Sequence, residues 1–490
     1  SPTVIDRLTR LYWAIGGMGR KKLGVVSLAL ITYFNVSGGP WGSEPIVAAC
    51  GPFVGIMATL VFPFIWCLPL ALSFAELFSA FPTDSSFCTW VGKAFGRRMG
   101  FHVGYWSWVS GVIDNAIYPC LMVDSVYAVL MGPHELHSFM VPTWMYLVRV
   151  TVATVFMLPT IFSIDAVGRF LLVLGLAMVA PFVVLVVVSV PQINPANWFV
   201  VSAAPQWSQL VSVLYWSYSG FDAAGAYASE IDSPRQTYPR AMMLTVGLVA
   251  LTYSVPFLAA SGVNKPSYSL WRDGYYPMIA EKISGPGLRT WFLGCALLGN
   301  LGVYIAKMTK NGFLLAGMAD LGLAPNFFIK RTASNGVPRR AILLSYGIIV
   351  FMALFDFNVI LGVDNFLSSL ACVTELCAVV RLRFTMPTLV RPYKVNISDR
   401  GLLVAMAIPF SIGSFVLLNE LTKSTLSLTL NLIALASGLV CQQFLHRAPA
   451  SVYTPLAAAI QLELGTPAPG GTFGIVTPAS PSVLEQHKGV

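Results

Sequence analysis

The chain has 490 residues, of which 56% are hydrophobic and only 10% are charged. Soluble domains carry about 25% charged residues, so the composition excludes a soluble globular protein and indicates a polytopic membrane protein. The length accommodates roughly twelve spans of about 20 residues with short loops. The net charge of +9 does not indicate a nucleic-acid partner, because basic residues in membrane proteins usually report topology.

The apolar segments predict twelve spans between two terminal segments. Residues 1–22 form a cytoplasmic N-terminal segment whose helical spacing over 3–19 fits either an interfacial helix or a mobile tail. Residues 448–490 are rich in Pro, Gly, Ser and Thr and are expected to form a disordered cytoplasmic tail. The spans are expected at 23–50 (broken), 53–80, 100–131, 143–164, 167–190, 208–230 (broken), 241–262, 290–320, 340–357, 362–380, 402–421 and 425–447.

The first span is interrupted in the middle of its apolar sequence. Asn35-Val36-Ser37-Gly38-Gly39-Pro40 contains a proline, which removes a hydrogen bond from a helix interior and clashes with the preceding turn. We therefore expect a break at this point, with exposed backbone groups on Ser37, Gly38 and Gly39.

The sixth span is interrupted in a similar way by Ser219-Gly220-Phe221-Asp222. Glycine weakens a helix by about 1 kcal/mol relative to alanine, and a carboxylate at the bilayer centre costs roughly 2.5 to 3.5 kcal/mol. Such residues usually persist where they face a protein-lined cavity. Two interruptions at corresponding places in two halves of a chain are typical of an inverted-repeat transporter with a site at the membrane midplane.

Basic residues predict the orientation. With the N-terminus inside, 22 of the 30 lysines and arginines lie on the inner side, six lie outside, including Arg149 at a span end, and Lys307 and Lys310 lie within the eighth span. This bias places both termini in the cytoplasm. The eight cysteines and five histidines show no spacing typical of a disulfide framework or zinc site, so no metal or cofactor is expected.

Several motifs together resemble the amino acid, polyamine and organocation transporter superfamily over about residues 23–447, and most closely its eukaryotic polyamine and cationic amino acid permeases of plants and protozoa. These motifs are FNVSGGPWG at 34–42, FPFIW at 62–66, AEL at 75–77 followed by FP at 81–82, SGVIDN at 110–115, SGFD at 219–222, GMADLG at 317–322 and RPYK at 391–394.

The resemblance implies an all-α membrane fold of two inverted five-helix repeats, the leucine-transporter-like fold, with discontinuous helices 1 and 6 and two extra helices. The repeats would cover 23–190 and 208–380, followed by the last two spans at 402–447. Related bacterial exchangers have a tryptophan six residues before an acid at the helix-6 break, a spacing that Trp216 and Asp222 match. Heavy-chain-linked relatives have a cysteine in a loop that here covers 132–142 and lacks one, so no disulfide-linked heavy chain is expected.

A substrate with ammonium groups loses water on binding and needs carboxylates, carbonyl oxygens and aromatic faces in return. The residues that we expect to bind substrate are Ser37, Gly38, Gly39, Asp114, Asn115, Trp216, Tyr218, Ser219, Gly220, Asp222 and Glu375.

The acids each have a structural alternative. Asp222 could cap a half-helix, Asp114 could pair with a lysine, and Glu375 could pair with a nearby arginine. Asp364 is expected near the outer end of its helix, as an entrance or capping residue. By the family pattern, Glu76 and Glu230 are expected to act in gating at the inner end.

The candidates for ion coupling are Lys307, Glu375 and Asp114. A lysine in the eighth span lies where sodium-coupled members of this fold build part of a sodium site. A buried lysine could take that place and support proton coupling, or it could form a pair with Asp114 or Glu375 that holds the bundle together.

We therefore expect a secondary active transporter in the plasma membrane, surrounded by lipid. It would move polyamines such as putrescine, spermidine or cadaverine, or basic amino acids, by alternating access with protons rather than sodium. The alternatives are a permease for neutral or a broad range of amino acids and a nutrient sensor that does not transport. An enzyme is disfavoured because HExxH, GxSxG and P-loop patterns are absent.

Overall fold

The computed structural model describes residues 23–83, 85–131, 141–161, 164–263, 268–271, 274–332, 336–423 and 425–447. The expectations for the N-terminal segment 1–22, for the tail 448–490 and for most of the 132–142 loop lie outside these residues. Each of the twelve predicted spans corresponds to a helical segment of the described chain.

The first half of the chain contains, in order, α2 (Val25–Val36), α3 (Pro45–Cys50), α4 (Pro52–Phe62), the π-helix η1 (Pro63–Cys67), α5 (Leu68–Ala80), α6 (Ser86–Phe95), α7 (Arg97–Met131), α8 (Thr143–Met157), η2 (Leu158–Ile161), α9 (Ile164–Ser189), η3 (Val190–Gln192) and η4 (Pro195–Phe199). The second half contains α10 (Trp207–Tyr218), η5 (Phe221–Glu230), α11 (Pro234–Val263), η6 (Tyr268–Leu270), α12 (Tyr275–Ser284), α13 (Pro286–Asp320), η7 (Asn326–Phe328), α14 (Arg339–Met352), α15 (Phe357–Thr385), α16 (Asp399–Lys423) and α17 (Thr425–Arg447).

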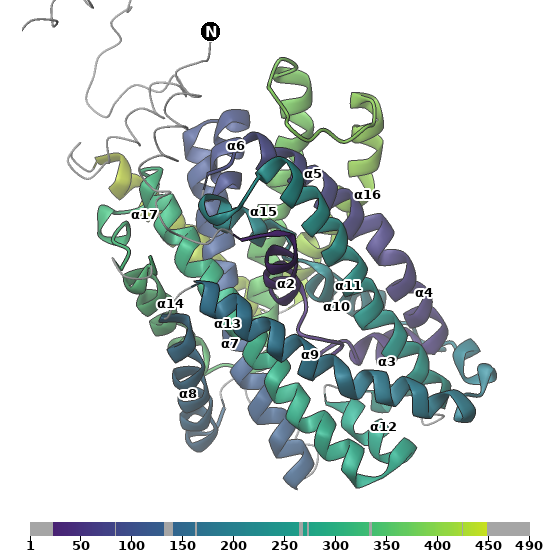
Figure 1. Cartoon of the computed structure of the whole chain (residues 1–490). Helices are drawn as coiled ribbons and strands as arrows, with labels where there is room; N and C mark the ends of the chain where they lie inside the picture. The colour runs from purple at the N-terminus through teal and green to yellow at the C-terminus, as the bar shows by residue number, and fades with distance from the viewer. Residues whose placement is uncertain are drawn as a thin grey trace, which may run out of the picture.

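The helices form one bundle with α2 at its centre (Figure 1). We call the end of the bundle that holds α6 the α6 end, at the top of Figure 1, and the opposite end, with α3 and α12, the α3 end. The short helices α6 and α12 occupy stretches that the sequence predicted as loops.

Eight of the described helices are long and apolar enough to cross a membrane by length and composition alone. The other four predicted spans are the two broken ones, the 14-residue α14, and α7, whose apolar sequence is interrupted by polar and charged residues. The most apolar window of α13 is 67% buried inside the protein, whereas that of α17 is 17% buried. The helix α13 is therefore a core helix, and α17 lies at the periphery.

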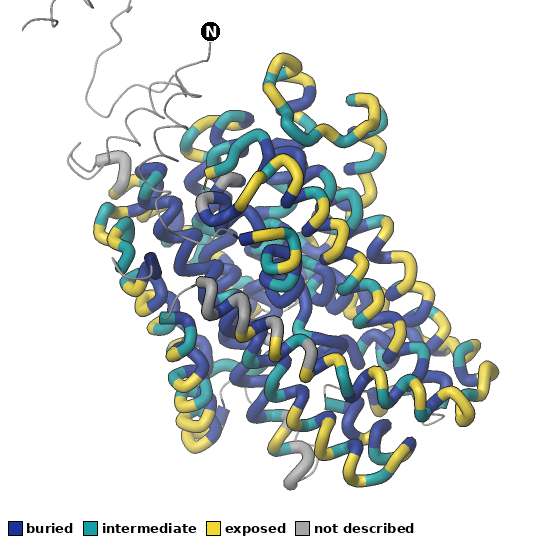
Figure 2. The backbone as a smooth tube through the Cα atoms, viewed as in Figure 1, coloured by how far each residue is buried: buried dark blue, intermediate teal, exposed yellow. Residues whose placement is uncertain are grey.

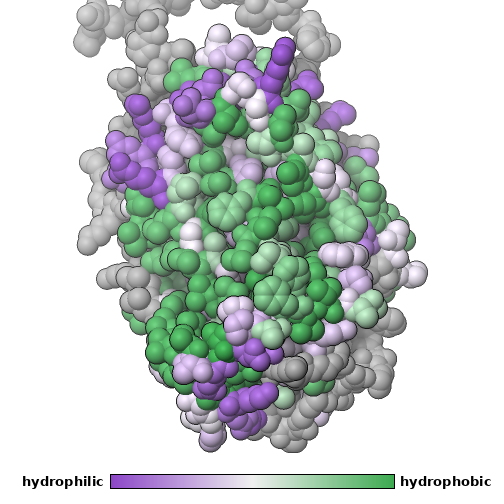
Figure 3. Space-filling model, turned by 90° about the vertical axis from the view of Figure 1, so that its right-hand side faces the viewer, coloured by the Kyte–Doolittle hydropathy of each residue, from purple (hydrophilic) through white to green (hydrophobic). Residues whose placement is uncertain are grey.

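The outer surface of the bundle fits a lipid environment. Exposed residues lie mainly on the outward sides of the peripheral helices (Figure 2), and many of them are large apolar residues. On the face shown in Figure 3, hydrophobic side chains form a broad band between hydrophilic regions at the two ends. An apolar band of this kind is the surface expected of a protein that crosses a bilayer.

Both predicted helix breaks are present. The helix α2 ends at Val36, Ser37 is extended, and Gly39 and Gly42 have φ angles of +102° and +78° before α3 begins. The helix α10 ends at Tyr218, and Gly220 has a φ of +115° before η5 begins. Positive φ angles favour glycine because it has no Cβ, which explains why both interruptions contain glycine.

The segments α2 and η5 contact each other at two levels. At the breaks, a Cβ added to Gly220 would lie 2.6 Å from the Asn35 carbonyl oxygen. Near the α6 end, the Leu23 amide donates to the Glu230 carbonyl over 2.7 Å, and the Asp232 amide donates to the Leu23 carbonyl over 3.1 Å. The half-helix α2 and the segment η5 are therefore fixed to each other both at their breaks and near the α6 end.

Candidate functional site

A cavity of about 80 Å³ lies between the two breaks and α5, α7, α13 and α15. Five charged side chains line it, although charged residues are rare in the spans: Asp114, Asp222, Asp364, Lys307 and Lys310. Charged residues within membrane helices are costly and usually mark the path of a substrate or an ion. This cavity is the candidate site.

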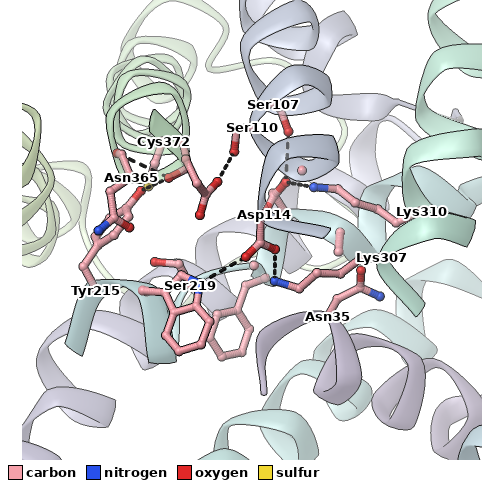
Figure 4. Close-up of a pocket in the computed structure, with 18 of the residues that line it drawn as sticks. Asn35, Ser107, Ser110, Asp114, Tyr215, Ser219, Lys307, Lys310, Asn365 and Cys372 are labelled. Carbon is pink, nitrogen blue, oxygen red and sulfur yellow. Dashed lines mark hydrogen bonds and ion pairs between the residues drawn. The ribbon is translucent and has the colours of Figure 1, made fainter. Parts of the chain in front are cut away.

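The first ion pair of the cavity joins α7 to α13. The Lys307 ammonium contacts the Asp114 carboxylate (Figure 4). It also lies 5.3 Å from the centre of the Tyr118 ring. The Asp114 carboxylate also accepts hydrogen bonds from the Trp216 indole over 3.0 Å and from the Tyr118 hydroxyl over 3.3 Å. Of the two predicted partners of Lys307, the structure therefore selects Asp114.

The second ion pair lies nearer the α6 end. The Lys310 ammonium is 3.3 Å from the Asp222 carboxylate, which also accepts a hydrogen bond of 3.3 Å from the Ser107 hydroxyl. Asp222 is the second residue of η5, so the helix break brings its side chain to the cavity. The two lysines are three residues apart on α13 and therefore lie on the same side of the helix.

The helix α15 contributes two further acids. Asp364 accepts a hydrogen bond of 2.7 Å from Ser110 and lines the cavity. It lies two turns inside α15, so the expectation that it caps the helix or marks an entrance is wrong. Glu375 is buried and does not line the cavity, but it interacts electrostatically with Asp222 and Lys310.

Charge counting gives the cavity an excess of carboxylates. Three acids and two lysines line it, so carboxyl groups outnumber ammonium groups by one. Two of the acids, Asp114 and Asp222, contact lysines. Asp364 accepts a hydrogen bond from the neutral Ser110 hydroxyl. The additional carboxyl group suits a cation.

Trp216 lies between this cavity and a smaller one of about 20 Å³, because its side chain lines both. Ser37 and Gly38, from the α2 break, line the smaller cavity. Trp216 also packs on Gly42, where an added Cβ would lie 2.7 Å from the indole ring. The indole therefore forms a wall between the two cavities, held by Asp114 on one side and by Gly42 on the other.

The remaining predicted site residues are distributed as follows. Ser219 and Gly220 line the larger cavity. Gly39 lies in the α2 break but lines neither cavity. Asn115 is fully buried and lines neither cavity. The Tyr218 hydroxyl donates a hydrogen bond of 3.2 Å to the Thr59 carbonyl.

Two residues that sequence reasoning missed are Ser107 and Ser110, which hold Asp222 and Asp364. Their spacing offered a signal, because positions 107, 110 and 114 repeat at three and four residues and so share one face of α7 with Asp114. The importance of these serines follows from their partners on other helices, which no local spacing indicates.

Comparison with known proteins fits this geometry. The amino acid permease family matches residues 23–440. The chain belongs to this family. It is 34% identical to the polyamine transporter RMV1 of Arabidopsis thaliana over 432 residues, covering 87% of this chain and 86% of the relative. It is 32% identical to the polyamine transporter PUT1 of Oryza sativa subsp. japonica over 430 residues, covering 87% and 78%.

A more distant bacterial relative of the permease is a probable agmatine/putrescine antiporter of Lactococcus lactis. The two are 25% identical over 385 residues, which cover 70% of this chain and 77% of the relative.

The permease has a second buried ionic cluster near the α6 end. Arg383 binds both carboxylate oxygens of Glu76, over 2.8 and 2.5 Å. The Arg391 Nε lies 2.9 Å from Glu76, and the Val395 amide donates to Glu76 over 2.9 Å. Burial lowers the pKa of the Arg391 guanidinium from its ordinary value, although the Glu76 carboxylate opposes this effect. This Glu76 cluster fixes the connection between α15 and α16 to α5.

Proposed function

We propose that the permease moves small organic cations, polyamines and/or basic amino acids, across a membrane by alternating access. The observation that carries this proposal is the excess of carboxylates over ammonium groups in a buried cavity. A cationic substrate would neutralise this excess, because each ammonium group that loses water needs a carboxylate or dipole in return. The polyamine transporters among its relatives support the same choice.

Two acids are the proposed ligands of the substrate ammonium groups. Asp222 and Asp114 come from different helices and lie on the same cavity, so together they suit a substrate with two amines. Asp364 is close enough to interact electrostatically with both lysines, and Glu375 with Lys310. They supply the remaining negative charge of the site.

The helix breaks provide the rest of the proposed binding site. Trp216 and Ser219 face the larger cavity, where the indole offers a π face to a cation. At the α2 break, Ser37 and Gly38 line the smaller cavity and place backbone groups beside it. These groups suit the carboxylate and amine of a basic amino acid, so the site can take a diamine or an α-amino acid with a cationic side chain.

A permease for neutral amino acids is the weaker candidate. A zwitterion carries no net charge, so the excess negative charge of the site would remain after it bound. Burying uncompensated charge in a membrane protein is unfavourable by several kcal/mol. The charge balance of the site therefore favours a cation.

Proton coupling is proposed for the same cluster. Lys307, Asp114 and Glu375 are the candidates for binding the coupling proton, because each is buried or half-buried among charges of both signs. Lys307 places an ammonium group next to the first helix break, and a cation there would repel sodium. We therefore propose that transport does not depend on sodium.

We further propose that the permease lies in the plasma membrane with both termini in the cytoplasm, as the distribution of lysine and arginine indicates. In this orientation the α6 end faces the cytoplasm. The two inverted repeats would cover 23–190 and 208–380, followed by the last two spans at 402–447.

Uptake of radiolabelled putrescine, arginine and leucine into liposomes that contain the purified permease tests the proposal. We expect uptake of putrescine, arginine or both, with a dependence on pH and none on sodium. Uptake of leucine alone would overturn it. Saturable binding of putrescine without counterflow would instead support a sensor.

A further inference from the structure

We propose that Lys307 and Lys310 act as tethered substitutes for the substrate. They would allow the empty permease to switch the side of the membrane to which its cavity opens. The consequence is net transport rather than obligatory exchange. This inference rests on the function proposed above, because it assumes that Asp114 and Asp222 bind the ammonium groups of the substrate.

The chemistry of lysine matches that of the proposed substrate. A lysine side chain is a primary ammonium group on a flexible stem of four carbons, and putrescine is a four-carbon stem with an ammonium group at each end. The Lys307 ammonium contacts the Asp114 carboxylate, and the Lys310 ammonium lies 3.3 Å from the Asp222 carboxylate. In the empty site, two aminobutyl groups of the protein therefore sit on the two carboxylates that we assign to a diamine.

Burial explains why such substitutes matter. The Asp114 side chain is 5% exposed and that of Asp222 is 20% exposed. A buried carboxylate that loses its only cation is strongly destabilised. Without the lysines, the site would be stable only when a substrate filled it. The cavity could then switch from one side of the membrane to the other only with a substrate bound.

The structure also offers the displaced lysines another acceptor. Asp364 of α15 lines the same cavity as both lysines. When a diamine binds Asp114 and Asp222, the flexible lysine stems can redirect their ammonium groups toward this carboxyl group.

Uptake of radiolabelled putrescine into empty liposomes and into putrescine-loaded liposomes distinguishes net transport from exchange. We expect the wild-type permease to show both activities. In Lys307→Met and Lys310→Met, net uptake into empty liposomes should fall at least about tenfold, because the empty site then contains an unpaired buried carboxylate. Exchange should persist in both variants, because substrate fills the site in each direction.

A control variant sharpens the test. Lys330→Met removes an exposed lysine that lies outside the cavity and should change neither activity. Persistent exchange in the Met variants also shows that they are folded.

Equal loss of net uptake and exchange in the Met variants, or equal retention of both, would overturn the inference. The first result would make the lysines part of the substrate site or the scaffold, and the second would make them dispensable. If the wild-type permease moves no amine in either arrangement, the proposed function itself fails. A working wild-type permease with unaltered Met variants refutes the lysine inference alone.

Discussion

The two buried ionic clusters of the permease differ in chemistry and in surroundings. In the central cavity, Asp114 and Asp222 each meet one lysine ammonium group and a serine or aromatic donor. In the Glu76 cluster, one carboxylate binds the fork of Arg383, approaches Arg391 and accepts a backbone amide. The side chains of Glu76 and Arg383 are 4% and 2% exposed.

The difference shows how one protein separates exchangeable ion pairs from permanent ones. Arginine presents a rigid, planar fork that binds a carboxylate at two points, whereas lysine presents a point charge on a flexible stem. The lysine pairs line a cavity of about 80 Å³, and the Glu76 cluster lines neither of the two cavities described. We therefore assign exchange of partners to the first cluster and structural support to the second.

The largest expected effect is at the exchangeable cluster. Asp222→Asn removes the charge that binds Lys310 and, as proposed, the substrate, so uptake of putrescine should fall by about 100-fold, or nearly 3 kcal/mol. Liposome uptake and the amount of protein at the cell surface measure this change. Asp232→Asn, at an exposed acid, is the matched control, and full uptake by Asp222→Asn would place the cation site elsewhere.

At the permanent cluster, Glu76→Gln should affect stability rather than selectivity. Removing one member of a buried ionic cluster is unfavourable by about 3 kcal/mol, because Arg383 and Arg391 lose their shared carboxylate. The measurement is the thermal unfolding midpoint of the purified protein in detergent. An unchanged midpoint would mean that the cluster does not support the structure.

A smaller effect is expected at Asp364. Asp364→Asn keeps a hydrogen-bond acceptor for Ser110 but removes one negative charge of the site. The KM for putrescine should rise about tenfold, which corresponds to about 1.4 kcal/mol, while the unfolding midpoint stays close to that of the wild type. A similar rise in KM for a substrate with a single amine would contradict a role in balancing a second charge.

The smallest effect sharpens the contrast between lysine and arginine. Arg383→Lys keeps the charge beside Glu76 but loses one of the two parallel hydrogen bonds, so stability should fall by about 1 kcal/mol. Thermal unfolding of Arg383→Lys and Lys310→Arg, measured side by side, tests this. If Arg383→Lys is as stable as the wild type, the fork geometry does not distinguish the two clusters.

The sequence was sufficient to predict the spans and both helix breaks. Glycine, proline and polar residues inside apolar segments disrupt a helix locally. They therefore predicted the breaks at Ser37 and Gly220 directly. The same reasoning located Asp114 and Asp222 as acids of the site. The short helices α6 and α12 were missed because, at 10 residues each, they are too short to cross a membrane.

The partners of the charged residues could not be predicted in the same way. Glu76 and Arg383 are 307 positions apart in the chain, and only the packing of the bundle brings them together. Arg149, predicted at an outer span end, is fully buried and binds Asp124 over 3.0 Å. Asp364 was misplaced because α15 begins at Phe357, before the start of the span predicted at 362–380.

The double contact between α2 and η5 has a mechanical consequence. If either segment moved alone, the backbone hydrogen bonds of Leu23 with Glu230 and Asp232 would break, and each unpaired buried group would be unfavourable by about 1 to 3 kcal/mol. The close approach of Gly220 to Asn35 adds a steric lock at the other level. We therefore expect the two segments to move together if access to the cavity changes.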